Sequence, residues 1–191
     1  DLGVPSDSTV SLAKLTATGT KNSTTFLRGD NTFNAPPNTG ITEADQFRLT
    51  ADISNPSGDI SSNLERVDDA TFAKIGTGMT ESSGIYTFPS TGLYLVTLIT
   101  QTTAINDAAM VVTMQSSSNS GTSYDDIANS MSGIASGSIN VTMSIGTFVN
   151  VTNASTFRVK FASSSFASGT LKGDTSKTET GFTFIRLGDS Q

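Results

Sequence analysis

The chain has 191 residues and a net charge of −6, and it contains no histidine, cysteine or tryptophan. This composition excludes hydrolases with an imidazole base, disulfide bonds and thiolate metal sites, and we expect no enzymatic activity. The 11 Lys and Arg residues are scattered and no apolar run approaches the roughly 20 residues of a membrane span, so we expect neither nucleic-acid binding nor membrane insertion.

The first 40 residues are polar and lack sustained hydrophobic periodicity, which is typical of a segment that cannot fold alone. They open on Asp1 rather than Met, which indicates a processed product or part of a longer protein. We expect residues 1–40 to form an extended stalk or anchoring arm that ends in a stiff Pro36-Pro37 hinge. Its apolar exceptions are expected to pack against sister chains or a partner; they are Leu12, Leu15, Phe26, Leu27 and Phe33.

From residue 41 to residue 191, short strand-like runs follow one another, separated by Gly, Asn, Ser and Asp. Val141, Met143 and Ile145 alternate with polar residues, which is the pattern of a half-buried strand. The run 93–99 is apolar on both faces and predicts a central strand that is covered on both sides. The predicted strands lie near 46–52, 63–67, 71–75, 83–88, 92–103, 108–116, 122–131, 138–151, 155–163 and 178–187, and they indicate an all-β sandwich of about ten strands.

Two acidic pairs, Asp68-Asp69 and Asp125-Asp126, could suggest catalysis or calcium binding. Adjacent carboxylates on a strand point to opposite faces, so neither pair makes a glycosidase dyad by itself. The spaced acidic loop that is typical of calcium sites is absent. We therefore interpret both pairs as solvated loop charges and expect no cofactor, while a structural calcium ion on a loop or trimer axis stays open.

The irregular stretch 116–138 is the first candidate for a receptor-binding loop, because it mixes an aromatic ring with amides, hydroxyls and carboxylates. Such groups bind sugars by stacking and hydrogen bonds. Within it we single out Tyr124, Asp125, Asp126 and Asn129, against the simpler interpretation of a soluble connector. The stretch 162–181 is the second candidate.

The segment GIYTFPSTGLYLVTL, residues 84–98, resembles the central signature of the complement globular-head and tumour-necrosis-factor-like superfamily. The matching positions are Gly84, Ile85, Tyr86, Phe88, Pro89, Gly92, Leu93 and Tyr94, with Tyr86 where Phe is usual. The segments 144–161 and 181–187 resemble the late hairpin and closing strand of that family. The resemblance implies a ten-stranded jelly roll that assembles as a homotrimer. In such an assembly we expect the aromatic residues of the strong strands to pack in the core or at the trimer contact, namely Phe88, Tyr94, Phe148, Phe182 and Phe184.

The segment TTFLRGDNTF, residues 24–33, resembles a phrase that recurs in tail fibres and other bacteriophage appendages, usually with Trp where this chain has Phe33. In that setting Arg28-Gly29-Asp30 is a turn, with Gly29 relaxing the backbone and Asp30 bonding locally. The alternative is an integrin-binding tripeptide, but nothing else in the sequence indicates an animal extracellular protein, and three residues are weak support.

Together these features predict a bacteriophage virion appendage, a tail or head fibre on the external surface. Its trimeric head would bind a host surface glycan or protein, and its arm would contact other virion proteins. The alternative is a capsid decoration protein whose arm lies across the shell. A polysaccharide depolymerase is disfavoured by the missing histidine and carboxylate dyad, and a secreted animal head domain would require glycans and folding without disulfides.

Overall fold

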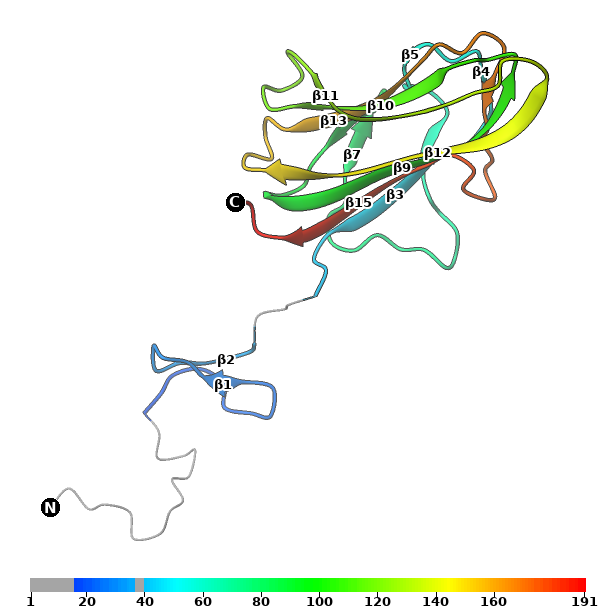
Figure 1. Cartoon of the computed structure of the whole chain (residues 1–191). Coiled ribbons are helices and arrows are strands. Elements are labelled where there is room, and N and C mark those ends of the chain that lie inside the picture. The colour runs from blue at the N-terminus through cyan, green and yellow to red at the C-terminus, as the bar shows by residue number, and fades with distance from the viewer. Residues whose placement is uncertain (1–15, 37–39) are drawn as a thin grey trace, which may run out of the picture. The chain divides into compact units, whose positions relative to one another are not determined.

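The computed structural model describes residues 16–36 and 40–191 (Figure 1). By its internal contacts the chain divides into a unit of residues 1–40 and a head of residues 41–191. The expected hinge lies mostly outside the described residues, because only Pro36 of that segment is among them. The described residues contain no helix, and hence none long and apolar enough to cross a membrane.

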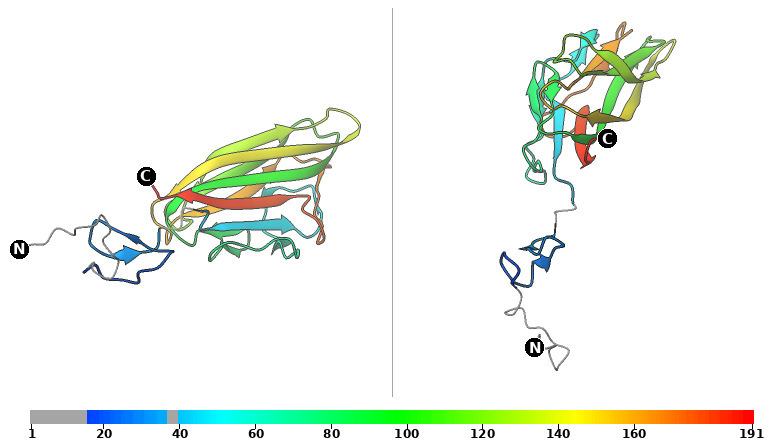
Figure 2. Two further views of the ribbon diagram at one scale, coloured as in Figure 1. Left: turned by 90° about the horizontal axis from the view of Figure 1, so that it is seen from below. Right: turned by 90° about the vertical axis from the view of Figure 1, so that its left-hand side faces the viewer.

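The head is a sandwich of two antiparallel sheets (Figure 2). The strands of the first sheet have the order β6-β3-β15-β9-β12. Strand β14 pairs with the C-terminal part of β9, and β4 pairs with β14. The second sheet has the order β11-β10-β13-β8-β7, with β5 also paired to β13. The bounds in the first sheet are β3 Ala44–Leu49, β4 Ile53–Ser54, β6 Leu64–Arg66, β9 Gly92–Ile105, β12 Ser138–Val151, β14 Thr170–Leu171 and β15 Gly181–Gly188; those in the second are β5 Gly58–Asp59, β7 Thr80–Ser82, β8 Ile85–Thr87, β10 Met110–Ser117, β11 Asp125–Ser132 and β13 Arg158–Ser164.

Alternation along β9 and β12 sets which side chains enter the core. Tyr94, Val96 and Leu98 of β9 are buried, and so are Met143 and Ile145 of the paired β12. These residues face the second sheet, because side chains two positions apart lie on the same face of a strand. The opposite face of β9 is not covered within the single chain: Leu93 and Leu95 are half-buried and Ile99 is 51% exposed. The expectation that 93–99 is covered on both sides is therefore wrong for the isolated chain.

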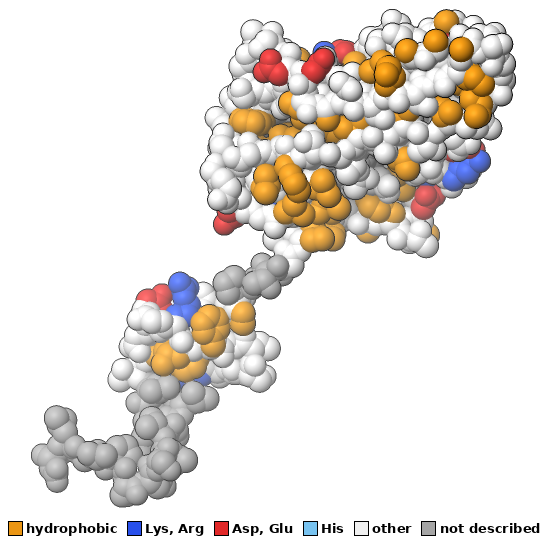
Figure 3. Space-filling model, in the orientation of Figure 1, with side chains coloured by type: hydrophobic (Ala, Val, Ile, Leu, Met, Phe, Trp, Pro, Cys, Tyr) orange, Lys and Arg blue, Asp and Glu red, His pale blue; other side chains and the backbone are white. Residues whose placement is uncertain are grey.

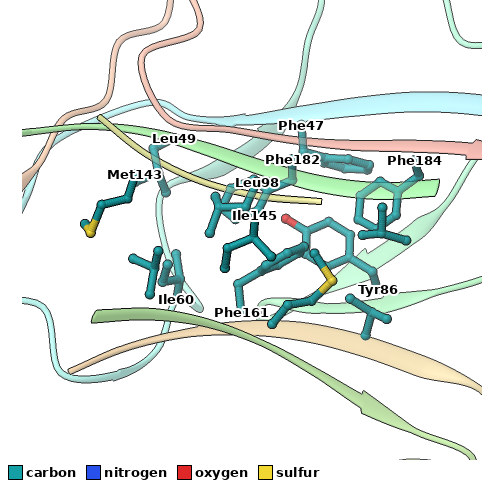
Figure 4. Close-up of a cluster of buried hydrophobic side chains, with 14 of the residues drawn as sticks. Phe47, Leu49, Ile60, Tyr86, Leu98, Met143, Ile145, Phe161, Phe182 and Phe184 are labelled. Carbon is teal, nitrogen blue, oxygen red and sulfur yellow. The ribbon is translucent and has the colours of Figure 1, made fainter. Parts of the chain in front are cut away.

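A cluster of aromatic rings forms the centre of the core (Figure 4). Tyr86 lies at its middle, with ring centroids 5.2 Å from Phe47, 5.8 Å from Phe161 and Phe182, and 4.9 Å from Phe184. Each such pair contributes about 1 kcal/mol beyond the area that it buries. The Tyr86 hydroxyl is buried without a hydrogen-bond partner, and burial raises its pKa well above the usual value.

The segment with the family resemblance forms β8, a turn and the start of β9. The Tyr94 hydroxyl bonds to the backbone oxygen of Ser90 at 3.1 Å and lies 3.0 Å from the Ser90 hydroxyl, so it holds the turn closed. Gly92 is required by close packing, since a Cβ there would lie 2.7 Å from the backbone oxygen of Gly188 on β15. Phe88 packs edge-to-face on Tyr94, with ring centroids 4.8 Å apart.

The predicted strands differ from the structure in three places. The predicted strand 71–75 is wrong: this stretch is a loop that touches β3 through a single bridge between Ile75 and Ala44. The predicted strand 83–88 is half of a tight hairpin, because Ser83 and Gly84 both adopt positive φ and return the chain from β7 to β8. The short head strands β4, β5, β7 and β14 were not predicted, since two or three residues are too few to show alternation.

Asp107 links the loops at one end of the sandwich, here called the distal end. Its carboxylate accepts hydrogen bonds from the backbone N–H of Ile105 at 3.0 Å, of Ser168 at 3.1 Å and of Ala167, and its backbone oxygen accepts one from Ile134 at 2.7 Å. The side chain is fully buried. Burial alone would raise the pKa of Asp107, but the amide hydrogen bonds outweigh it and lower the pKa below its usual value.

The described part of the first unit doubles back instead of running extended throughout. Strand β1, Phe26–Leu27, pairs antiparallel with β2, Phe33–Asn34, and Thr18 forms a parallel bridge to Thr32. Phe33 is buried within this unit, whereas Phe26 and Leu27 are more than two-fifths exposed. Of the apolar residues expected to pack, the hairpin therefore buries Phe33 and leaves Phe26 and Leu27 on its surface. Leu12 and Leu15 lie outside the described residues.

Replacing Tyr86 by Phe is expected to stabilise the protein by about 1 kcal/mol, because it removes a buried hydroxyl that no group satisfies. Tyr94→Phe is the matched control and is expected to cost about 1 kcal/mol, since the Tyr94 hydroxyl is bonded. Chemical denaturation at one fixed protein concentration measures both changes. Equal losses of stability in the two variants would contradict the role assigned to the orphan hydroxyl.

Asp107→Asn is expected to lower the free energy of unfolding at pH 7 by about 2 kcal/mol, because an amide NH₂ group would oppose backbone N–H donors. Because the folded pKa is lowered, the stabilisation by Asp107 is present above pH about 4 and is lost as the pH falls through the folded pKa. The gap between wild type and variant should therefore close in acid. Asp125→Asn, at an exposed carboxylate, should change stability little at any pH; a gap of constant size would contradict the assignment.

Candidate functional site

The four predicted receptor-binding residues lie along one edge of the second sheet. Tyr124 ends the loop between β10 and β11, and Asp125, Asp126 and Asn129 are on the edge strand β11. Asp126 accepts a hydrogen bond from Gln115 at 2.6 Å. Asn129 is exposed in the middle of the strand.

Tyr124 is less free for ligand binding than its sequence context suggests. The Lys160 ammonium lies 4.4 Å from the centre of the Tyr124 ring, and it also forms an ion pair with Asp59 at 2.9 Å. This cation–π contact occupies one face of the ring. The Tyr124 hydroxyl is buried without a partner. Stacking of a sugar on that ring face would first have to displace Lys160.

The two ends of the head carry different parts of the candidate loops. Ile41 precedes β3 at the end of the head where β15 ends, because Ala44 of β3 is paired with Ile185 of β15. We call this the proximal end. The loop 118–124 lies at the same end, since Ser117 is paired with Arg158 and Ser120 N–H donates to the Thr156 oxygen at 2.8 Å. Residues 133–137 and 165–169 instead meet at the distal end around Asp107. The structure thus joins the distal parts of the two candidate stretches and places Tyr124 away from them.

An apolar surface covers the outer side of the first sheet near its proximal end; we call it the apolar face. It contains Leu93, Leu95 and Ile99 of β9, Phe148 of β12, and Ile185 and Leu187 of β15. Phe148 is 62% exposed and Leu187 is 52% exposed. The strand register aligns Phe148, Leu95 and Ile185 in one row. In Figure 3 hydrophobic side chains gather on this side of the head.

The apolar face bears no charge. Its outward positions, the odd residues of β9, the even residues of β12 and the odd residues of β15, include no ionisable side chain. Of the five aromatic residues expected in the core or at the trimer contact, Phe88, Tyr94, Phe182 and Phe184 are buried, and Phe148 is on this face. In the sequence, this face was indicated by the run 93–99, which is apolar at its odd-numbered as well as its even-numbered positions.

The pair Asp68-Asp69 has a structural role. Arg48 is fully buried and forms ion pairs with Glu65 at 2.7 Å, Asp68 at 2.7 Å and Asp69 at 2.8 Å, and it also donates to the Thr175 oxygen. Burial alone would lower the Arg48 pKa, but its ion pairs with Glu65 and Asp69 outweigh this effect and raise it. The Asp68 side chain is 77% exposed and the Asp69 side chain is 40% exposed, so both carboxylates are solvated, as interpreted from the sequence. In addition they neutralise a buried guanidinium and hold two loops on β3.

No metal centre is evident in residues 16–36 and 40–191: these residues include no group of three or more acidic side chains that could hold an ion. Asp45, the buried acid of β3, is also held by protein contacts. It pairs with Arg66 at 2.9 Å and accepts a hydrogen bond from Met79 N–H at 2.8 Å. These contacts join Arg66 of β6 and Met79, which precedes β7, to the same carboxylate.

Arg28, Gly29, Asp30 and Asn31 form a tight turn between β1 and β2, closed by a 3.1 Å hydrogen bond from Asn31 N–H to the Arg28 oxygen. Asp30 accepts hydrogen bonds from the Thr32 hydroxyl at 2.6 Å and the Thr32 N–H at 3.1 Å, which lower its pKa. Positive φ occurs at Asn31, 61°, and not at Gly29, so the role expected of Gly29 is wrong. These local bonds and the Arg28–Asp30 ion pair show that the tripeptide forms the turn at the tip of the β1–β2 hairpin.

No protein-family model matches the chain, and no curated protein matches it. Solved structures match it in fold. Eiger TNF from S. frugiperda superposes with a TM-score of 0.62 at 10% identity, over 80% of this chain and 96% of that one. Murine APRIL at pH 5.0 gives a TM-score of 0.54 at 11% identity, and at pH 8.0 a TM-score of 0.54 at 12% identity; each comparison covers 76% of this chain and 98% of that one. The predicted all-β jelly roll is confirmed, and the head has the fold of tumour-necrosis-factor-type domains.

Proposed function

We propose that the chain is a homotrimeric virion appendage whose head binds a host cell surface and whose first unit attaches it to the particle. The observation that carries the trimer is the uncharged apolar face on a protein with a net charge of −6. Exposed clusters of large apolar side chains mark interaction sites. A second copy of the same chain is the partner that such a face suits, because no like charges are brought together there.

The virion role is supported by the first unit. Residues 24–33 resemble the bacteriophage appendage phrase, and they form a hairpin whose Phe26 and Leu27 remain exposed. Exposed apolar side chains on so small a unit favour packing against sister hairpins or a particle protein. The same hairpin accounts for the Arg-Gly-Asp sequence as a turn, so no animal receptor is needed to explain it.

The proposed mechanism of adhesion is multivalent. Three heads held on one axis present three equivalent sites, so a second contact forms at the effective concentration set by the first. Weak single sites then give useful adhesion. This requires no catalytic group, in keeping with the expected absence of enzymatic activity.

Phe148→Glu is expected to convert the trimer into a folded monomer at micromolar concentration, because it places three carboxylates in an apolar contact. The monomer should stay folded, since Phe148 is largely exposed in the single chain. Ile75→Glu, at a 45% exposed apolar residue outside the face, is the matched control and should remain trimeric. Sedimentation velocity and circular dichroism measure the two properties; a wild-type monomer, or a trimeric Phe148→Glu protein, would contradict the proposal.

Antibodies against the head should label the tips of fibres on particles purified from the natural source. The proposal requires a projecting position, because the distal end has to reach another surface. Electron microscopy of labelled particles makes the measurement. Even labelling over the whole shell would instead support the capsid decoration alternative, and absence from all particles would exclude both.

A further inference from the structure

The distal end of the head carries a surface that the proposed adhesion can use. Its exposed residues come from three loops and include Asn106, Ala108, Ala135, Ser136, Ala167 and Ser168; we call it the distal surface. We propose that the distal surface is the adhesive site and that its ligand is an uncharged glycan. This inference rests on the proposed function and names its site and ligand class.

Charge decides the class of ligand. In the segments 105–109, 133–139 and 164–169 the one ionisable side chain is Asp107, which is 1% exposed and committed to backbone amides. From Ile127 to Phe157 the chain has no ionisable residue at all. The nearby Lys172 and Asp52 neutralise each other in an ion pair. A phosphorylated, sulfated or carboxylated glycan would find no cation here, and an amine would find no free carboxylate.

The residue types favour a glycan over a protein partner. The distal surface is made of hydroxyls, amides, backbone groups and alanines, with Ile105 and Ile139 at its margin. Serine and alanine are depleted in protein–protein interfaces, whereas aromatic residues, Met and Arg are enriched there. Hydroxyl and amide groups can both donate and accept hydrogen bonds, as sugar hydroxyls do. Short side chains also let a polymer approach the backbone.

The distal loops are already held in place. Asp107 binds the loops 105–109 and 165–169 to each other, and Ile134 N–H donates to its backbone oxygen. Asn106 and Gly137 exchange two hydrogen bonds, of 3.0 Å and 2.8 Å. Asn55 N–H donates to the Gly169 oxygen at 2.8 Å, which adds a fourth segment. A rigid surface loses little conformational entropy on binding, and this helps a site that has only weak contacts.

The direction of the chain also favours this end. Ile41 enters the head at the proximal end, where the loop 118–124 with Tyr124 lies. In Figure 1 the C-terminus marks this proximal end, and the loops after β9, β11 and β13 lie at the opposite one. Within the head, the distal surface is therefore at the opposite end from the point where the chain enters at residue 41.

The test uses the full-length chain and four uncharged polymers, dextran, mannan, galactan and chitin oligosaccharides, with dextran sulfate as the charged counterpart of dextran. Biolayer interferometry should show binding to at least one uncharged polymer, weaker binding to dextran sulfate, and less than a twofold change between low and high salt. Ala135→Lys should reduce the apparent affinity at least tenfold, because each loss is multiplied over three sites. Ser118→Lys, in the proximal loop 118–124, is the matched control and should bind as wild type.

Sedimentation velocity on each variant separates the two proposals. A trimeric Ala135→Lys protein that binds as wild type would overturn the distal site, and so would loss of binding in Ser118→Lys alone. A trimer that binds none of the uncharged polymers, or only dextran sulfate in a salt-sensitive way, would overturn the ligand class. A wild-type chain that stays monomeric would overturn the proposed function instead.

Discussion

The pairing of β9 with β12 over fourteen residues is the constraint on which the rest of the head depends. It joins the two longest strands in one register, and that register decides which side chain of each strand enters the core. Tyr94, Leu98 and Ile145 are part of the hydrophobic core because of it. A shift of one residue would exchange the two faces of the strands and expose the core positions.

The same register creates the apolar face. Once the even positions of β9 point inward, Leu95 and Ile99 must point outward, and the register places Leu95 beside Phe148 of β12. Core and outer face are therefore two results of one pairing. Charge follows the opposite distribution, with Arg48, Arg66 and their carboxylate partners on the β3–β6 side of the sandwich. There the ions close loops on the fold, and the β9–β12 side stays neutral.

Much of the fold could be predicted from sequence because the long strands alternate and the segment 84–98 carries a specific turn. Other features depend on contacts that no local pattern records. The turn residues Ser83 and Gly84 fall within the predicted strand 83–88, and Asn31 adopts the left-handed conformation that glycine usually provides. Asp107 resembles any loop aspartate until the fold brings the N–H groups of residues 167 and 168 to it.

The interaction surfaces were harder to predict for a related reason. Tyr124 was predicted to bind a receptor because it is an aromatic residue among polar ones, but Lys160, which is distant in sequence, covers one face of its ring. The distal surface has no aromatic or charged residue that would single it out, and only the meeting of three loops defines it. Phe148 could be assigned to packing in general, whereas the choice between core and outer face required the strand register.

The loop between β11 and β12 is held by hydrogen bonds of Ile134 and Gly137. Residues 135 and 136 lie between these two positions and take no part in those bonds. A foreign peptide spliced between them would extend from a closed base without disturbing the sandwich. In the proposed trimer, that splice point would present the guest sequence in triplicate, so the head could serve as a small scaffold for antigens or affinity tags.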